Sequence, residues 1–360
     1  MCNAVKFLPN RVWRVYSGGS GIDRMRGTVP EQDGHFPEDW IASTSRANNP
    51  QYEKSDQGLS MVELPEGAVL FRDYLADDPE RTLGGEHYKK HGANALLLMK
   101  ILDAAEQLPI QCHPTVPDAR RYFNSNFGKT EAWYVVATRE INGQQPYLLV
   151  GFNEKLSVDQ FKAEARNGSF TTGVDMLHKL EVRPGDCLLI RGGLPHAIGC
   201  GVTLIEVMEP SDLVIQPEHF CGTQRLSEAE RWSGAAIEDA LNCFNYTVES
   251  VDDIRQNHFM EPQVVDDSLQ IVVPREQAHY FEVQKLTCKN RYTLLNREHC
   301  HRAGVVTSGS LELYDGKSRL NLNSGDAFFL PCQLEQCTFT GNGEVVFALP
   351  PLFQTADSEK

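Results

Sequence analysis

Several features are scarce or missing in this chain of 360 residues, and each absence excludes a class of protein. No apolar run approaches the roughly 18 residues of a membrane-spanning helix. No stretch concentrates Lys and Arg, and the formal net charge is −15, which opposes binding to nucleic acid or to an anionic membrane. The first residues lack the apolar core of a secretory leader, so we expect a cytoplasmic protein.

Disulfide and zinc-finger patterns are missing too. The ten cysteines are scattered without a Cys-x-x-Cys pair, which predicts reduced and mostly buried thiols. An anionic small substrate stays compatible with the negative charge of the chain. Because the overall field would oppose its approach, a few specific cations inside a pocket would have to bind it.

Short β-type runs bounded by Gly, Pro, Asn and Asp dominate the sequence, and helical patterns are few. Capping motifs at Ser157 and Ser227 predict two helical regions, of which the first stops near Gly168 and the second runs toward Phe244. The fold class that follows is mainly β, with two barrels, a short helical connector and small helical insertions. We predict a metal-binding N-terminal barrel over 1–221, a connector over 222–262, and a degenerate C-terminal barrel over 263–360.

Four residues in three separate stretches are candidates for one metal site. Gln111 and His113 are two residues apart, so on a strand they point the same way, about 6.6 Å apart along the backbone. Glu131 opens the strand-like run 131–138 and can present its carboxylate from the end of a neighbouring strand. His196 follows a Pro-Gly-Asp turn, a short apolar run and two glycines, a pattern that resembles the second signature of the cupins and aims one imidazole into a barrel.

Two imidazoles, one carboxylate and one amide oxygen favour zinc over manganese, cobalt or iron, with one ion per chain. Only Glu131 among these ligands is anionic, so a dication there keeps positive charge with which to polarise a carbonyl or hydroxyl. The alternative is that both histidines are satisfied interior residues, and the complete spaced set argues against it. His299 and His301 form a second tempting pair, but no nearby carboxylate or matching histidine completes a site.

Ordered motifs give the chain a resemblance to a known family. Residues 40–43 (Trp-Ile-Ala-Ser), 100–104 (Lys-Ile-Leu-Asp-Ala), 111–114 (Gln-Cys-His-Pro), 128–131 (Gly-Lys-Thr-Glu) and 195–197 (Pro-His-Ala) occur in the order and spacing of the class I mannose-6-phosphate isomerases. These are zinc-dependent enzymes built on paired cupin (jelly-roll) barrels. The match runs through most of the N-terminal two thirds of the chain.

The resemblance implies reversible conversion of mannose 6-phosphate to fructose 6-phosphate through an enediol, with zinc held by the four candidate ligands. It also implies that Lys100, Lys129 and Asp212 handle the sugar, and that Trp40 lies in the substrate region. Independently of the resemblance, Lys100 sits inside the apolar run 96–102, where a buried ammonium needs a pocket or a carboxylate partner. The alternative for each lysine is a solvated surface charge, and for Asp212 a turn residue bonded to its own backbone.

Two departures from the family pattern fall on anion handling. Gln216 stands where the family has an arginine, and a neutral amide cannot replace a guanidinium. Pro109 stands where the family has a serine, and it offers neither a hydroxyl nor a backbone N–H. Arg225 or Arg191 could compensate from another direction.

Three functions therefore stay open. The first is the family's isomerase reaction, the second is an isomerase or epimerase of a non-phosphorylated or different sugar, and the third is a non-catalytic sugar-binding cupin. The expected partner is a small sugar or sugar phosphate, with neither nucleic acid nor membrane, and the expected assembly is a monomer or a homodimer.

Overall fold

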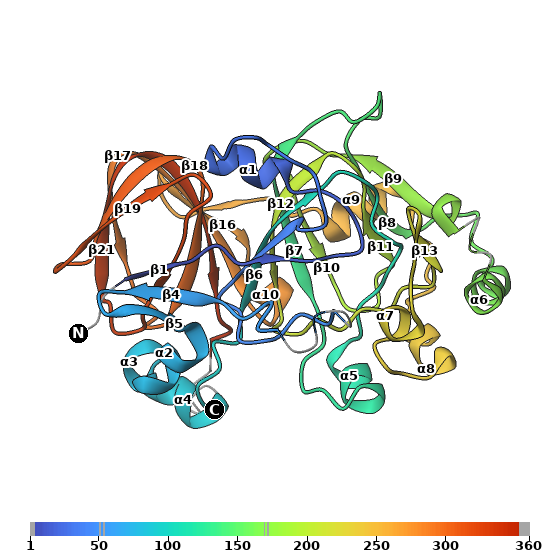
Figure 1. Cartoon of the computed structure of the whole chain (residues 1–360), viewed down its shortest axis with the longest axis horizontal. Helices are drawn as coiled ribbons and strands as arrows, with labels where there is room; N and C mark the ends of the chain where they lie inside the picture. The colour runs from blue at the N-terminus through green and yellow to red at the C-terminus, as the bar shows by residue number, and fades with distance from the viewer. Residues whose placement is uncertain (1–3, 50–51, 53–54, 169, 171–172, 353–360) are drawn as a thin grey trace.

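The computed structural model describes residues 4–49, 52, 55–168, 170 and 173–352, and within them the chain is mainly β, as predicted. Figure 1 shows two β lobes side by side, with the C-terminal strands in orange and red in one lobe and the green strands in the other. No helix in the described part of the chain is long and apolar enough to cross a bilayer.

The first lobe contains a six-stranded sheet with the strand order β10-β7-β12-β6-β3-β2 and a three-stranded sheet with the order β11-β8-β9. A separate two-stranded hairpin, β13-β14, follows these strands in the sequence. Their bounds are β2 Arg11–Val12, β3 Glu38–Ile41, β6 Leu98–Ala104, β7 Glu131–Thr138, β8 Tyr147–Phe152, β9 Leu177–Glu181, β10 Cys187–Ile190, β11 His196–Ile198, β12 Val202–Met208, β13 Phe220–Cys221 and β14 Gln224–Arg225. All pairings within these sheets are antiparallel.

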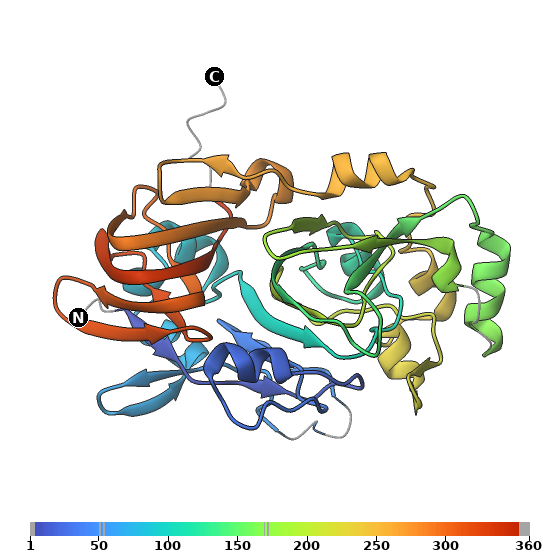
Figure 2. The ribbon, with the colours of Figure 1, turned by 90° about the horizontal axis from the view of Figure 1, so that it is seen from above.

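The second lobe is one ten-stranded antiparallel sheet, ordered β15-β16-β17-β21-β18-β20-β1-β4-β5, with β19 paired to β18. Its strands are β1 Val5–Phe7, β4 Met61–Leu64, β5 Gly67–Leu70, β15 Gln263–Val264, β16 Leu269–Val273, β17 Glu282–Leu295, β18 Arg302–Tyr314, β19 Arg319–Asn323, β20 Ala327–Leu330 and β21 Gln336–Leu349. Seen from above, the long strands of this lobe curve around its interior (Figure 2).

Three N-terminal strands therefore belong to the C-terminal sheet. β1 pairs with β20 and β4, and β4 pairs with β5. The division of strands between the two lobes therefore does not follow the predicted segment boundaries after 221 and 262. Those boundaries stay a prediction about domain organisation. Sequence patterns identify strands but not their partners, and the partner of Val5 is Phe329, more than 300 residues away.

The helices are short and lie between strands or at the periphery. They are α1 Ser20–Arg26, α2 Phe71–Asp77, α3 Pro79–Thr82, α4 Gly85–His91, α5 Val116–Tyr122, α6 Val158–Asn167, α7 Glu228–Trp232, α8 Ile237–Leu241, α9 Val251–His258 and α10 Arg275–Ala278, with a 3-10 turn at Gly173–Met176. The predicted caps are confirmed: Ser157 caps α6, which ends at the left-handed Gly168, and Ser227 forms a capping box with Glu230 at the start of α7.

An apolar cluster joins the two lobes. It packs Met99, Ile205 and Val207 of the six-stranded sheet with residues of the second lobe such as Val305 and Phe329. Each lobe also has an apolar interior of its own. The nine described cysteines are buried, which agrees with the sequence prediction.

Candidate metal centre and pocket

Three of the predicted ligands converge inside the first lobe. Ligand atoms of His113, Glu131 and His196 lie within 4.8 Å of one another, and all three side chains are buried. Nε2 of His113 is 3.2 Å from Oε2 of Glu131, and Nε2 of His196 is 3.6 Å from Oε1 of the same carboxylate. Glu131 starts β7 and His196 starts β11, so both ligands are fixed by sheet pairing.

The protonation of both imidazoles suits a metal. Nδ1 of His113 lies 2.9 Å from the carbonyl of Leu213, and Nδ1 of His196 lies 2.8 Å from the carbonyl of Leu194. A carbonyl only accepts, so each Nδ1 carries the proton and each Nε2 turns a lone pair toward the cluster. Nε2 of His196 is buried and has no hydrogen-bond partner among the described residues. A divalent ion would satisfy that atom.

Electrostatics keep the donors ready for a cation. Burial lowers the pKa of His113, and it lowers the pKa of His196 to about 3, so both rings stay neutral at physiological pH. Burial alone would raise the pKa of Glu131, but the Lys129 ammonium holds it well below its usual range. The indole of Trp133 donates to Oε1 of Glu131 at 2.9 Å and fixes the carboxylate.

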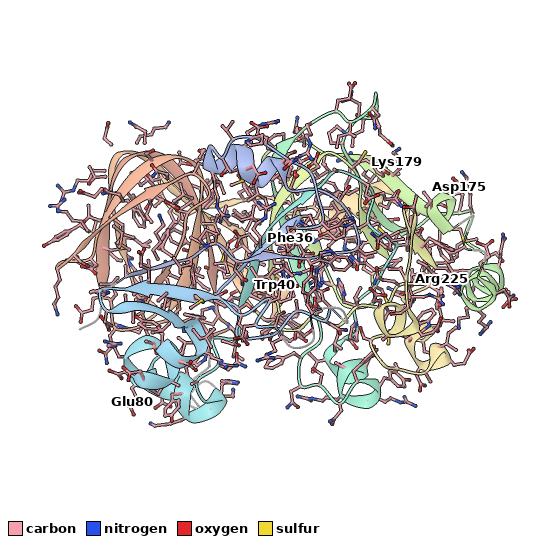
Figure 3. The ribbon with its side chains drawn as sticks, viewed as in Figure 1. Phe36, Trp40, Glu80, Asp175, Lys179 and Arg225 are labelled. Atoms are coloured by element: carbon pink, nitrogen blue, oxygen red, sulfur yellow. The ribbon has the colours of Figure 1, made fainter. Side chains whose placement is uncertain are left out.

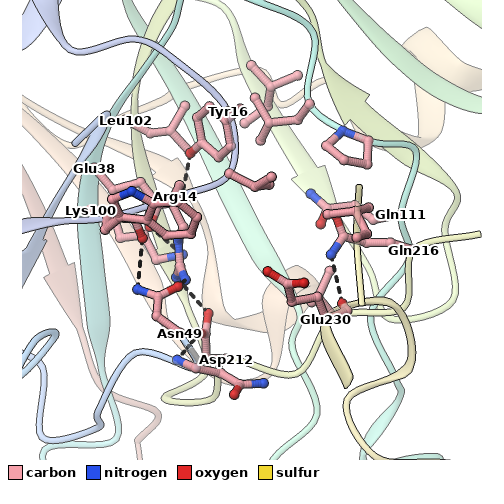
Figure 4. A pocket seen from close by; sticks show the side chains of 18 of the residues that line it. Arg14, Tyr16, Glu38, Asn49, Lys100, Leu102, Gln111, Asp212, Gln216 and Glu230 are labelled. Atoms are coloured by element: carbon pink, nitrogen blue, oxygen red, sulfur yellow. Dashed lines mark hydrogen bonds and ion pairs between the residues drawn. The ribbon is translucent and has the colours of Figure 1, made fainter. Parts of the chain in front are cut away.

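Gln111 lies next to the cluster. Its backbone pairs with His196 in both directions, with N–H···O distances of 2.8 and 2.9 Å, and its side chain lines the adjoining pocket. Figure 4 shows it beside Gln216 on the pocket wall opposite Arg14 and Lys100. Its role as a fourth ligand stays a prediction.

A pocket with a cavity volume of about 90 Å³ lies beside the metal cluster. Lys100, Lys129, Asp212 and Gln216 line it, while their roles toward a substrate stay predictions. Lys129 connects the pocket with the cluster, because its Nζ lies 2.8 Å from Oε2 of Glu131 and 2.9 Å from Nε2 of His113.

Lys100 has the carboxylate partners that its burial requires. Its Nζ lies 3.0 Å from Oε1 of Glu206 and 3.7 Å from Oε2 of Glu38, and these pairs raise its pKa against the effect of burial. Glu206 faces Lys100 across the β6–β12 pairing. The sequence contained a signal for this pair, a single Glu in the apolar run 202–207.

The pocket contains an arginine that the sequence did not reveal. Arg14 lies 3.0 Å from both Glu38 and Asp212, and these two carboxylates raise its pKa although burial opposes the charge. Asp212 also accepts from the backbone N–H of Asn48, so its partners are tertiary rather than its own turn. Burial opposes the charge of Glu38, but Arg14 and Lys100 lower its pKa to about 2.

Trp40 lies behind this network rather than on the pocket surface. It is fully buried, its indole donates to Glu38 at 2.6 Å, and its ring faces the charges of Arg14 and Lys100 at 5.1 and 4.9 Å. Trp40 does not line the pocket, and its ring stabilises the two pocket cations from behind. Its role in substrate binding stays a prediction.

The two arginines expected to compensate for Gln216 lie elsewhere. Arg225, which Figure 3 labels, is exposed on β14 and does not line the pocket. Arg191 donates to the carbonyl of Asn257 at 3.1 Å. Gln216 itself donates to the carbonyl of Glu230 at 2.9 Å (Figure 4). The positions of Arg191 and Arg225 in the sequence could not show which groups their side chains contact.

The second histidine pair does not form a metal group with a carboxylate or cysteine among the described residues. Nε2 of His301 contacts the carbonyl of Ala95 at 2.8 Å and ties the second lobe to the loop before β6, whereas His299 is exposed with a φ of 48°.

Comparisons with known proteins agree with the geometry. No family model matches the chain. It is 25% identical over 251 residues to the mannose-6-phosphate isomerase ManA of Bacillus subtilis, covering 69% of this chain and 73% of that protein. It is 24% identical over 253 residues to the mannose-6-phosphate isomerase of Streptococcus mutans, covering 69% and 72%. The chain is similar to mannose-6-phosphate isomerases.

Solved structures share the fold over nearly the whole chain. The mannose 6-phosphate isomerase of Bacillus subtilis superposes with a TM-score of 0.70 at 20% identity, covering 96% of this chain and 99% of that one. A mutant of phosphomannose isomerase from Salmonella typhimurium gives a TM-score of 0.74 at 14% identity, covering 97% and 100%. At these identities the likeness concerns the fold.

Proposed function

We propose that this protein is a metal-dependent aldose–ketose isomerase, whose first candidate reaction is the conversion of mannose 6-phosphate to fructose 6-phosphate. The observation that carries the proposal is the buried His113–Glu131–His196 cluster, with an unpartnered Nε2 on His196, in contact with Lys129, which lines a pocket together with Lys100. The names of the relatives point to the same reaction.

The group that we propose at the cluster is zinc, with Gln111 as the fourth ligand. The neutral imidazoles and the single carboxylate fit a borderline divalent ion and leave it with positive charge. When bound, such an ion supplies Lewis-acid stabilisation of negative charge on a sugar oxygen.

The residues of the chain then have to move a proton between C1 and C2. Glu206 is the best base among the pocket carboxylates. Burial and the neighbouring Glu131 raise its pKa, and its Oε1 accepts no hydrogen bond of good geometry, although Lys100 lies 3.0 Å away. Glu38 accepts from Arg14, Tyr16 and Trp40, and both oxygens of Asp212 are occupied. We propose that Oε1 of Glu206 takes the C2 proton and returns it at C1.

The ammonium groups complement this transfer. As the proton leaves C2, negative charge develops on the sugar oxygens of the enediol, and a fixed cation stabilises it. Lys100 and Lys129 both lie within 4 Å of Glu206, at 3.0 and 3.8 Å. They can therefore donate to oxygens of a sugar whose C2 faces Glu206. Asp212 would act on the substrate only by orienting Arg14.

The test uses zinc-loaded protein and mannose 6-phosphate in D₂O. We expect chelator-sensitive formation of fructose 6-phosphate with solvent deuterium incorporated at the transferred position. Glu206→Gln should lower kcat by about 100-fold or more, as expected for a lost proton-transfer group, while Glu86→Gln on the exposed surface should keep it. Full activity of Glu206→Gln would refute its role as base. Absence of deuterium exchange with every aldose, metal bound, would favour a sugar-binding protein instead.

A second candidate substrate is an aldose without a phosphate. Each cation that lines the pocket already has carboxylate partners: Arg14 has Glu38 and Asp212, Lys100 has Glu206, and Lys129 has Glu131. A phosphate would find no uncommitted cation among the described pocket residues, and the Glu230 carboxylate lies in the pocket lining near Gln216.

Substrate comparison distinguishes the two candidates. If the second holds, kcat/KM for mannose should equal or exceed that for mannose 6-phosphate. Gln216→Arg should then raise turnover of the phosphorylated sugar, because it restores a guanidinium on the pocket wall. A strong preference of the natural chain for mannose 6-phosphate would reject the second candidate and leave the isomerase proposal intact.

A further inference from the structure

The second lobe contains a cavity of its own, away from the metal cluster. It has a volume of about 460 Å³ and is lined mainly by residues of strands β16 and β17 and the start of β18. These strands are drawn in orange in Figure 2. Apolar and polar residues share its lining. They are Val265, Asp266, Leu269, Ile271, Glu282, Gln284, Tyr292, Thr293, Leu294, Leu295, Arg297, Glu298 and Arg302.

Arg302 is the unusual member of this lining. Arg302 is only 4% exposed, yet no carboxylate among the described residues forms an ion pair with its guanidinium. Its guanidinium donates to two neutral amide oxygens, Gln284 Oε1 and Asn296 Oδ1, and both hydrogen bonds are long at 3.4 Å. A buried guanidinium with such partners is poorly compensated.

The other buried arginines of the chain show the contrast. The buried Arg231 has Glu228 at 2.9 Å, and even the half-buried Arg14 has two carboxylates at 3.0 Å. Arg275, close to the same cavity, has Glu282 at 3.0 Å and Glu298 at 2.8 Å. The fold thus supplies anions to its buried arginines, with Arg302 as the exception among them.

The cavity carboxylates are directed to other partners. Glu282 accepts from Arg275 and, at 2.6 Å, from the amide of Gln284, whose oxygen faces Arg302. Asp266 accepts from the hydroxyl of Tyr292 at 2.8 Å and from backbone N–H groups. Gln284 is therefore held with its acceptor toward Arg302, and the guanidinium is positioned at the cavity wall without a counter-charge.

We infer that this cavity binds a small organic anion whose carboxylate or phosphate group pairs with Arg302. The planar guanidinium matches either group with two parallel hydrogen bonds. Arg297, which also lines the cavity and has no ion pair among the described residues, adds positive charge at the same place. The apolar side chains of Leu269, Ile271 and Leu294 suit the organic part of a metabolite better than a bare ion.

The test measures binding of citrate, fructose 6-phosphate and inorganic phosphate to the full-length protein by calorimetry and thermal melting. We expect at least one organic anion to bind and raise the melting temperature. Arg302→Gln should weaken that binding by about 30-fold or more, since it removes one partner of a buried charged pair. Arg302→Lys keeps the charge without the planar fork and should give an intermediate loss. The exposed Arg183→Gln is the matched control.

Melting in buffer without these anions supplies an independent readout. Arg302→Gln should melt at the natural temperature or above it, because it removes an uncompensated buried charge. Binding by inorganic phosphate alone, or binding that Arg302→Gln leaves unchanged, would overturn the proposal. A lower melting temperature of Arg302→Gln, with no anion bound by the natural chain, would assign Arg302 a purely structural role. Each of these outcomes is independent of isomerase activity.

Discussion

The buried pair of Lys100 and Glu206 allows a quantitative test of the pocket. Lys100 is 3% exposed and Glu206 is equally buried, with Nζ and Oε1 3.0 Å apart. Lys100→Met keeps the shape of the stem but leaves Glu206 buried without its main partner. Breaking a buried ion pair in this way costs about 3 to 5 kcal/mol. Because Lys129 still lies 3.8 Å from Glu206, we expect a loss near 3 kcal/mol.

Both thermal and urea unfolding measure this loss. With an unfolding entropy of about 2.1 cal/mol/K per residue, the chain of 360 residues should melt about 4 °C lower. The double variant Lys100→Met with Glu206→Gln removes both charges. It should recover at least about 2 kcal/mol relative to the sum of the single variants, because no uncompensated charge remains. It should nevertheless stay inactive, since both proposed catalytic groups are missing.

An exposed pair provides the control. Lys89 and Glu86 lie 2.6 Å apart on α4, with side chains that are 72% and 78% exposed. Lys89→Met should change stability by less than about 0.5 kcal/mol, because solvent screens the pair. The reasoning is refuted if Lys100→Met costs no more than this control, or if the effects of Lys100→Met and Glu206→Gln simply add.

Two further predictions concern the metal and pH. Lys129→Met should raise the affinity for zinc by about tenfold or more, because the Lys129 ammonium contacts the same atoms of His113 and Glu131 that a metal ion needs. Competition with a chelating dye measures this affinity, and weaker zinc binding by the variant would contradict the prediction. Burial raises the pKa of Glu218 to about 7, so its neutral form is favoured in the fold and its contribution to stability falls as pH rises from about 4.5 to 7. Glu218→Gln, which keeps an acceptor for the N–H of Ile110, should therefore be up to about 3 kcal/mol more stable than the natural chain in urea at pH 8 and similar at pH 4.5; an unchanged pH dependence would exclude Glu218 as its source.

Local patterns determined much of the secondary structure. The run 131–138 is strand β7 with the same bounds, and Ser157 and Ser227 cap the helices that they were expected to open. Such features depend on side-chain alternation and on hydrogen bonds between residues three apart, so neighbours in the chain suffice to specify them. The need of Lys100 for a carboxylate was equally local, because an ammonium in an apolar strand is costly without one.

Long-range packing decided the rest. Arg14 and Asp212 are 198 positions apart in the sequence, and no motif around either residue predicts their contact. Strands β1, β4 and β5 belong to the sheet of the C-terminal half, although their short sequences do not indicate with which strands they pair. Arg225 is close to Gln216 in sequence but does not line the pocket.

The sequence by itself determined which residues could hold a metal and where strands and helices begin, because spacing and alternation are properties of adjacent residues. Only the tertiary structure decided which charges meet: the carboxylates that occupy each pocket cation, and the absence of one for Arg302 among the described residues. Ion pairing depends on distances of a few ångströms between segments far apart in the chain, and packing alone sets those distances.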